Sequence, residues 1–244
     1  AGSGLGAFGR GCRDALPQEI DLLFSHLHLD HSAGLPFFKP AVLDAARTIH
    51  TWCGNLDGQS AEAALDRLFS PPLFPVTLDV LPCTFRHHGF RAGEPLIFAD
   101  GSRVDTILLD HPQGSTGFRF DHAGKRLCVI SDIEHGANWP DPTLLRFVEG
   151  ADLIVYDGMF TEGEYPCCKG WGHSTWQKGV ELAQGAGAKR SPSSISIPAI
   201  PTRSCAWSRP RCRPRCPPPS SPASASRSKS AARWWRWPSR RSGP

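Results

Sequence analysis

The chain of 244 residues is long enough for one large α/β domain with a hydrophobic core of its own, and its formal net charge of +4 indicates a mildly basic protein. It contains no apolar run of about 18 residues, and its first residues lack the charged-then-apolar layout of a secretory signal. We therefore expect a cytoplasmic protein with no membrane partner.

The net charge conceals two segments of opposite sign. Residues 1–190 hold 16 Lys and Arg against all 23 Asp and Glu, which makes −7, whereas residues 191–244 carry +11. The second segment has 14 Ser and 11 Pro but no Leu, Val, Phe or His. A segment of this composition cannot bury a core. We expect a folded domain at residues 1–190 and a disordered, basic, Ser/Pro/Arg-rich tail at residues 191–244.

The elements predicted in chain order begin with a glycine-rich turn, AGSGLGAFGR, whose lack of a preceding strand predicts that an upstream segment is missing. Strands are predicted where short apolar runs end at a polar residue, at residues 19–25, 47–53, 103–110 and 152–156. Residues 117–131 have the pattern of a hairpin. Helices are predicted at residues 60–69, 141–148 and 174–188. This alternation predicts a layered α/β sandwich.

The strongest chemical signal is HLHLDH, which directly follows the first predicted strand. It places three histidines and an aspartate, His26, His28, Asp30 and His31, within six residues. Imidazole nitrogens and carboxylate oxygens are the ligands that zinc and its first-row neighbours accept. Alternate residues of a tight loop can face two different ions, so the motif predicts a two-metal centre. The alternative is a solvent-facing, histidine-rich loop without metal.

This motif resembles the HxHxDH hallmark of the metallo-β-lactamase superfamily, and the resemblance extends over residues 1–190. It implies a four-layer αβ/βα sandwich, truncated at its N-terminus and followed by a non-native tail. DHPQGSTGFRF is similar to the segment that supplies a third histidine, which would be His111. SDIEH is similar to the segment that supplies a bridging carboxylate, which would be Asp132.

A further motif, GWGHST, resembles the HST motif of the ribonuclease Z and phosphodiesterase branch of that superfamily. The resemblance makes His173 the proton donor to the leaving group, and the alternative is a loop histidine ahead of a helix. Glu134 and His135 could orient ligands from outside the ligand set or lie on the surface. Asp157 ends a strand that faces the same edge, so a supporting role is open to it.

The resemblance implies two divalent ions, with Zn²⁺ first and Mn²⁺ or Fe²⁺ as alternatives. One ion would be held by His26, His28 and His111, the other by Asp30 and His31, and both by Asp132. Asp30 is also assigned a catalytic role. The implied reaction is attack of a metal-bridging hydroxide on a phosphodiester, with His173 assisting departure of the leaving group.

The family pattern requires one more metal-binding histidine after the last helix, and this sequence has no histidine after His173. SPSSISIPAIP at residues 191–201 also lacks a strand pattern, so we expect the following strand to be absent. We interpret residues 191–244 as a frameshift product, which predicts weak occupancy of the second metal site. The competing interpretation is a genuine basic tail whose Trp234, Trp235 and Trp237 would bind nucleic acid by stacking and phosphate contacts.

Within hydrolases, small or cyclic phosphodiesters are the expected substrates. A ribonuclease Z-like endonuclease acting at RNA 3′ ends is the first alternative, and a thioester or lactone hydrolase is another, because a fold does not determine its substrate. A non-enzymatic alternative is a nucleic-acid-binding module that acts through the basic tail. The expected partners are thus a small phosphodiester or RNA, with a homodimer as a further expectation.

Sequencing the gene across codon 190 tests the frameshift interpretation. We expect that shifting the reading frame there restores an apolar strand that delivers a histidine. An uninterrupted frame whose shifted translation contains no such histidine would favour the genuine basic tail.

Overall fold

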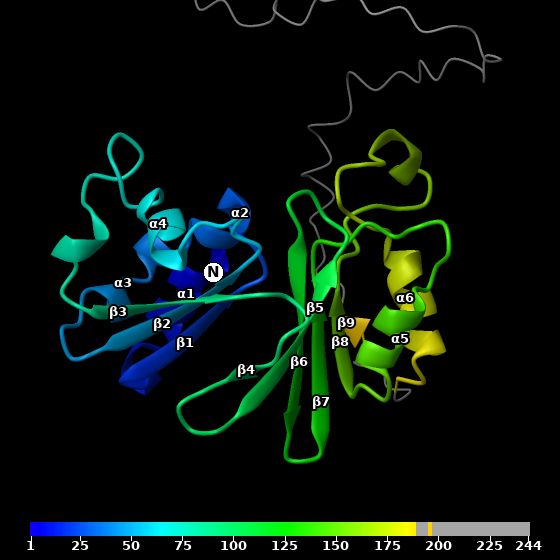
Figure 1. Ribbon diagram of the computed structural model, residues 1–244, viewed down its shortest axis with the longest axis horizontal. Helices are drawn as coiled ribbons and strands as arrows, with labels where there is room; N and C mark the ends of the chain where they lie inside the picture. Colours follow the sequence, from blue (N-terminus) through cyan, green and yellow to red (C-terminus); the bar gives the residue numbers. More distant parts are fainter. Residues whose placement is uncertain (189–194, 197–244) are drawn as a thin grey trace, which may run out of the picture. The chain divides into compact units, whose positions relative to one another are not determined.

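Two β-sheets carry the fold in the computed structural model, which describes residues 1–188 and 195–196 (Figure 1). The smaller sheet has the order β1-β2-β3, and both of its strand pairs are parallel. Its strands are β1 (Glu19–Phe24), β2 (Thr48–Gly54) and β3 (Thr84–Phe90). Because the strands are parallel, their carboxyl ends lie at one edge of the sheet.

The larger sheet has the order β4-β5-β6-β7-β8-β9. The first three pairs are antiparallel, and the pairs β7/β8 and β8/β9 are parallel. Its strands are β4 (Leu96–Ile97), β5 (Arg103–Leu109), β6 (Ser115–His122), β7 (Lys125–Ile130), β8 (Leu153–Tyr156) and β9 (Ile195–Ser196). Strands β5, β7 and β8 consequently run in the same direction, so their carboxyl ends also share an edge.

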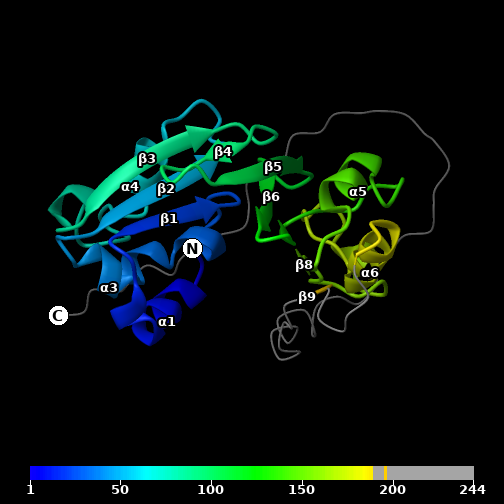
Figure 2. The same ribbon diagram turned by 90° about the horizontal axis from the view of Figure 1, so that it is seen from below.

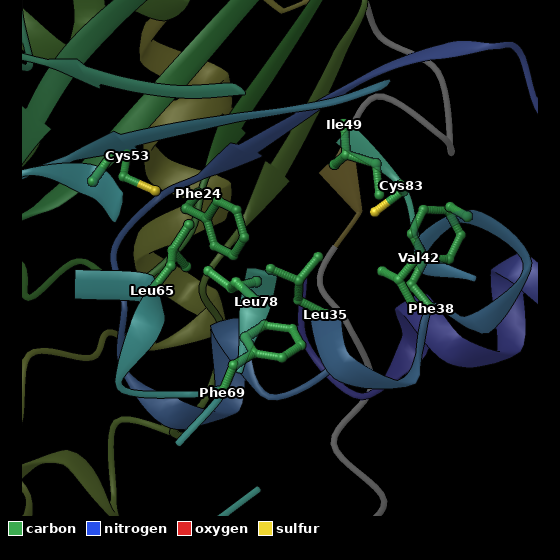
Figure 3. Close-up of a cluster of buried hydrophobic side chains, with 12 residues drawn as sticks. Phe24, Leu35, Phe38, Val42, Ile49, Cys53, Leu65, Phe69, Leu78 and Cys83 are labelled. Atoms are coloured by element: carbon green, nitrogen blue, oxygen red, sulfur yellow. The ribbon is translucent and has the colours of Figure 1, made fainter. Parts of the chain in front are cut away.

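Short helices cover one face of the smaller sheet, and Figure 2 shows α1 and α3 on that face. The helical elements of this half are α1 (Gly4–Gly11), η1 (Arg13–Ala15), α2 (Leu29–Ser32), η2 (Leu35–Phe37), α3 (Lys39–Val42), α4 (Ala61–Asp66) and η3 (Leu78–Val80). Alternate residues of the strands, such as Phe24 and Ile49, pack against Phe38, Leu65 and other buried side chains of these helices (Figure 3). The alternation is that of strands with one face on a core.

Two helices, α5 (Pro142–Val148) and α6 (Trp176–Gly185), cover one face of the larger sheet. A short 3-10 helix, η4 (Tyr165–Cys167), lies between β8 and α6 in the sequence. Ile130 and Ile154 of the sheet belong to one buried cluster with Leu144, Val148 and Leu182 of the helices. None of the helices in the described residues is both long and apolar enough to cross a lipid bilayer.

The remaining faces of the two sheets share a third apolar cluster. Leu23 and Trp52 from the smaller sheet pack in it with Val104 and Phe118 from the larger sheet. The backbone N–H of Thr116 also donates a hydrogen bond of 2.8 Å to the carbonyl of Ser25. The layers are thus helices, sheet, sheet and helices, which confirms the predicted αβ/βα sandwich.

Most predicted elements are confirmed, and the local chemistry explains where the helices begin. Ser60 accepts a hydrogen bond from the N–H of Ala63 at the start of α4, and Asp141 does the same for α5. The predicted start of the last helix at Ser174 is wrong by two residues, because α6 begins at Trp176 with Thr175 as its N-cap. Ser174 instead accepts a hydrogen bond of 2.8 Å from the hydroxyl of Tyr156.

Two other predictions are wrong. The N-terminal glycine-rich segment forms helix α1 rather than a turn. Gly6 and Gly9 are buried in it, and a Cβ on Gly9 would lie 2.6 Å from the ring of Phe38. The strand expected to be absent after the last helix is present as β9, paired in parallel with β8. The expected disorder and frameshift origin of the tail fall on residues 189–194 and 197–244, which lie outside the described residues.

The core of the smaller half predicts a clear effect of truncating Leu65, which is completely buried in α4. We expect Leu65→Ala to lower the free energy of unfolding by about 2–5 kcal/mol, because it removes buried methyl groups and leaves a cavity. Urea denaturation followed by circular dichroism measures the change. Leu73→Ala, at a side chain that is 80% exposed, is the control and should change it by less than about 0.5 kcal/mol. Equal losses in both variants would contradict this packing.

Candidate metal centre

His26, two residues after the end of β1, is the most buried of the candidate metal ligands. It is only 4% exposed, and its Nε2 is buried without a hydrogen-bond partner among the described residues. Its Nδ1 lies 3.2 Å from Oγ of Ser25. Burial lowers the pKa of His26 to about 3, so the ring is neutral at physiological pH and keeps a lone pair. A buried imidazole nitrogen without a partner is well suited to bind a metal ion.

Helix α2 brings the other two histidines of HLHLDH back toward His26. His28 is the N-cap of this short helix and His31 lies within it. The ring centroids of His28 and His31 lie 4.3 and 4.5 Å from that of His26. A single helical turn after a buried strand therefore gathers three imidazoles that are neighbours in sequence.

His111 reaches the cluster from the turn after β5. Its Nδ1–H donates a hydrogen bond of 2.7 Å to the carbonyl of Gly172, and its Nε2 lies 3.2 Å from Nδ1 of His28. The Nε2 of His28 is 2.9 Å from Oε1 of Gln113. One nitrogen of each ring is thus held by a neighbour, and the other faces the cluster. Ligand atoms of His26, His28 and His111 all lie within 4.8 Å of one another.

Gly172 must be a glycine for this contact to form. Its φ is +83°, and a Cβ at this position would lie 2.3 Å from Nδ1 of His111. No side chain fits at that distance, so the backbone can approach His111 only without one.

Asp132 follows β7 and lies between two histidines. Its carboxylate is 3.2 Å from Nε2 of His31 and 3.7 Å from Nδ1 of His173. Burial alone would raise the pKa of Asp132, but the hydrogen bond from His31 and the nearby histidine charges outweigh it and lower the pKa to about 2. Asp132 is therefore ionised and buried, and it forms a second group of candidate ligands with His26 and His31.

His173 pairs with Asp157, which follows β8. The Nδ1 of His173 lies 2.8 Å from Oδ2 of Asp157. Burial alone would lower the pKa of His173, but the hydrogen bond to Asp157 and the charges of Asp157, Asp132 and Asp30 raise it. Asp132, Asp157 and His173 form the third group of candidate ligands in the described residues.

The structure brings together His26, His28, His31, His111, Asp132 and His173, all of which were predicted from the sequence. Asp30 is different, because its side chain is 74% exposed, its carboxylate contacts His31, and it belongs to none of the three groups. The assignment of each side chain to a particular ion, and the catalytic role of Asp30, stay predictions. Gln113 and Gly172 were not predicted, since no spacing links them to the histidines that they orient.

Glu134 connects the segments that carry the site. Its carboxylate accepts hydrogen bonds from the N–H groups of Gly170 and Gly172, at 2.7 and 2.9 Å, and from the hydroxyl of Tyr165 at 2.9 Å. Its own N–H donates to the carbonyl of Asp110, the residue before His111, at 2.7 Å. One residue therefore ties the turn of His111 to the loop before His173.

The donor set fits divalent metal ions. It consists of four imidazoles and a buried carboxylate, and one buried nitrogen, Nε2 of His26, has no partner among the described residues. Neutral imidazole and ionised carboxylate are the forms that ligate zinc and related ions.

The chain is similar in sequence and in fold to several known proteins. A family model described as a β-lactamase superfamily domain matches residues 9–192. A ribonuclease Z of Porphyromonas gingivalis is 24% identical over 222 residues, covering 70% of this chain and 69% of that protein. The metallo-β-lactamase fold protein YhfI from Bacillus subtilis has a TM-score of 0.55 at 17% identity, covering 77% of this chain and 68% of that one. Human short-form tRNase Z also has a TM-score of 0.55, at 18% identity, covering 72% and 75%.

The hydrogen bonds of Glu134 predict an effect on metal affinity. We expect Glu134→Ala to weaken Zn²⁺ binding by about 10–100-fold, because Gly172 and hence His111 lose their anchor. Equilibrium competition with a chromophoric chelator measures the affinity. Glu149→Ala, at an exposed residue after α5, is the control and should bind Zn²⁺ as the unmodified chain does. Unchanged affinity in Glu134→Ala, with a folded protein, would contradict the role of this carboxylate.

Proposed function

The chain belongs to the β-lactamase superfamily and has the metallo-β-lactamase fold. We propose that it is a metal-dependent phosphodiesterase acting on small or cyclic phosphodiesters. The observation that carries the proposal is the pair of His173 and Asp157 beside Asp132. It adds a proton donor to a metal centre, and departure of an alkoxide from phosphorus needs such a donor.

The ligands would be His26, His28 and His111 on one side and His31 and Asp132 on the other, with Asp30 at the exposed rim. Divalent ions bound there would supply Lewis acidity that offsets charge on the phosphoryl oxygens and activates the attacking water. The protein's part is to hold these side chains in place. Buried Asp132 also balances the positive charge that the site would receive.

His173 is arranged to deliver a proton. Its Nδ1–H donates to Asp157, which leaves Nε2 as the nitrogen available to a substrate. The raised pKa of His173 favours the imidazolium form, and the carboxylates of Asp157 and Asp132 stabilise that form. Protonated Nε2 can therefore give its proton to the leaving oxygen while Asp157 keeps the ring in orientation.

Small substrates are favoured because the described residues form one compact unit, with no separate arm among them that could embrace a folded RNA. An RNA 3′-end endonuclease is the second candidate. The similarity to proteins named ribonuclease Z and tRNase Z supports it. An assay that offers a cyclic nucleotide and a tRNA precursor with a 3′ extension, each alone, separates the two candidates by which one is cleaved.

The role of His173 predicts a dependence on the leaving group. With saturating Zn²⁺ or Mn²⁺, we expect His173→Ala to lower kcat for a nucleoside 3′,5′-cyclic phosphate by about 10²–10⁴-fold, because its alkoxide leaves only when protonated. For bis(p-nitrophenyl) phosphate the loss should stay below about 10-fold, since p-nitrophenolate leaves without a proton.

The control is His122→Ala, at an exposed residue of the β6–β7 hairpin, which should leave both rates unchanged. His28→Ala should abolish both rates. Equal losses for the two substrates in His173→Ala would contradict proton donation, and no hydrolysis of any phosphodiester by the unmodified, metal-loaded chain would overturn the proposed function.

A further inference from the structure

An aromatic pair, exposed Trp171 and half-buried Phe160, lies beside His173. Trp171 is 62% exposed, and its ring meets that of Phe160 edge to face, with centroids 6.4 Å apart. The ring of Phe160 in turn meets His173 edge to face, with centroids 6.2 Å apart. The two aromatic rings therefore form a continuous path from the ring of His173 to the exposed surface at Trp171.

The backbone around both rings is firmly anchored. The residues on either side of Trp171 donate their N–H groups to the carboxylate of Glu134, and the N–H of Trp171 donates to the carbonyl of Cys168 at 3.1 Å. The N–H of Phe160 donates a hydrogen bond of 3.0 Å to the carbonyl of Ser174. The carbonyl of Phe160 accepts one of 3.2 Å from the N–H of Trp176. A single exposed tryptophan is common on protein surfaces. A tryptophan held in place on both sides, and linked through Phe160 to the proton donor, is a preformed contact surface.

The position of this surface indicates which part of a substrate it meets. His173 gives its proton to the leaving oxygen, so the rings next to it lie on the leaving-group side of the phosphorus. Flat aromatic faces stack with nucleobases whatever the base, and each stacked base contributes about 1–3 kcal/mol. A phosphodiester whose leaving alcohol carries an aromatic base is a nucleotide linkage.

We infer that Trp171 and Phe160 form a subsite for the base of the leaving nucleoside, so that the substrates are nucleotides rather than phosphodiesters in general. This inference rests on the proposed function and narrows its substrate class. Trp171 contacts the substrate and takes no part in the proton transfer. Its loss should therefore act through substrate binding, while the chemical step is retained.

The test compares two substrates that differ only in the leaving alcohol, a dinucleoside monophosphate and the methyl ester of the same nucleoside 3′-phosphate. We expect Trp171→Ala to lower kcat/KM for the dinucleotide by about 5–150-fold, mainly through KM, which corresponds to the stacking of one base. The methyl ester should be hydrolysed within about twofold of the unmodified rate. Trp171→Phe should retain most of the dinucleotide activity, because a phenyl ring still stacks.

Trp176→Ala is the matched control. Trp176 is also exposed, at 44%, and is the first residue of α6. Its hydrogen bond to Phe160 is made by the backbone N–H, which the substitution keeps. We expect it to leave both substrates unchanged. Equal losses on the two substrates in Trp171→Ala, or no loss on the dinucleotide, would overturn the subsite.

Binding of a nucleoside 5′-monophosphate, followed by calorimetry, tests the same surface without turnover. Trp171→Ala should bind it about 5–150-fold more weakly than the unmodified chain. Equal affinities would overturn the subsite even if phosphodiesters are hydrolysed. If the unmodified chain hydrolyses neither substrate, the proposed function fails, and the binding comparison still decides whether the aromatic pair recognises a base.

Discussion

The site depends on the convergence of strand ends from two different sheets. His26 follows β1 of the smaller sheet, whereas His111, Asp132 and Asp157 follow β5, β7 and β8 of the larger one. The backbone hydrogen bond from Thr116 to Ser25 joins the sheets at the residue before His26. Because the three strands of the larger sheet run in one direction, their terminal residues meet at one edge. The arrangement of the candidate ligands is thus a result of strand direction and of the contacts between the two sheets.

Gathering these groups is unfavourable without a metal ion to bind them. The rings of three other histidines surround His26, and its Nε2 is buried without a hydrogen-bond partner among the described residues. An unsatisfied buried polar group costs about 1–3 kcal/mol. The surrounding fold must supply that free energy, and the apolar clusters on the helical faces of both sheets are its source. A divalent ion bound by these nitrogens would remove the cost, which couples metal binding to stability.

The loop before α6 shows how one polar residue can organise a site from outside. Glu134 holds the N–H groups of Gly170 and Gly172, while the carbonyl of Gly172 holds His111. Burial alone would raise the pKa of Glu134, but the two N–H groups and the hydroxyl of Tyr165 lower it, so the carboxylate is ionised. Charge-assisted hydrogen bonds of this kind are stronger than neutral ones. The same carboxylate therefore holds the backbone on both sides of Trp171, next to His173, and through Gly172 the ring of His111.

The features that depend on neighbouring residues could be predicted from the amino-acid sequence. The apolar run before His26 predicted β1, the turn residues at 121–125 predicted the β6–β7 hairpin, and HLHLDH predicted a cluster of metal ligands. Helix α1 was missed because glycine has a low helix propensity, and packing against Phe38 overrides it. Strand β9 was missed because its residues have no strand pattern of their own. It is a strand through its parallel pairing with β8.

The contacts between residues far apart in the sequence could not be predicted and are known from the folded structure. The hydrogen bond between His111 and Gly172 joins residues 61 positions apart, and that between His28 and Gln113 joins residues 85 apart. The outward direction of Asp30, the pairing of Asp157 with His173 and the anchoring by Glu134 likewise follow from how strands and loops pack. Residue type and spacing set which groups can ligate or transfer a proton, because those are properties of side chains and local turns. The partners of these groups in the folded protein depend on long-range packing, which a local sequence pattern does not predict.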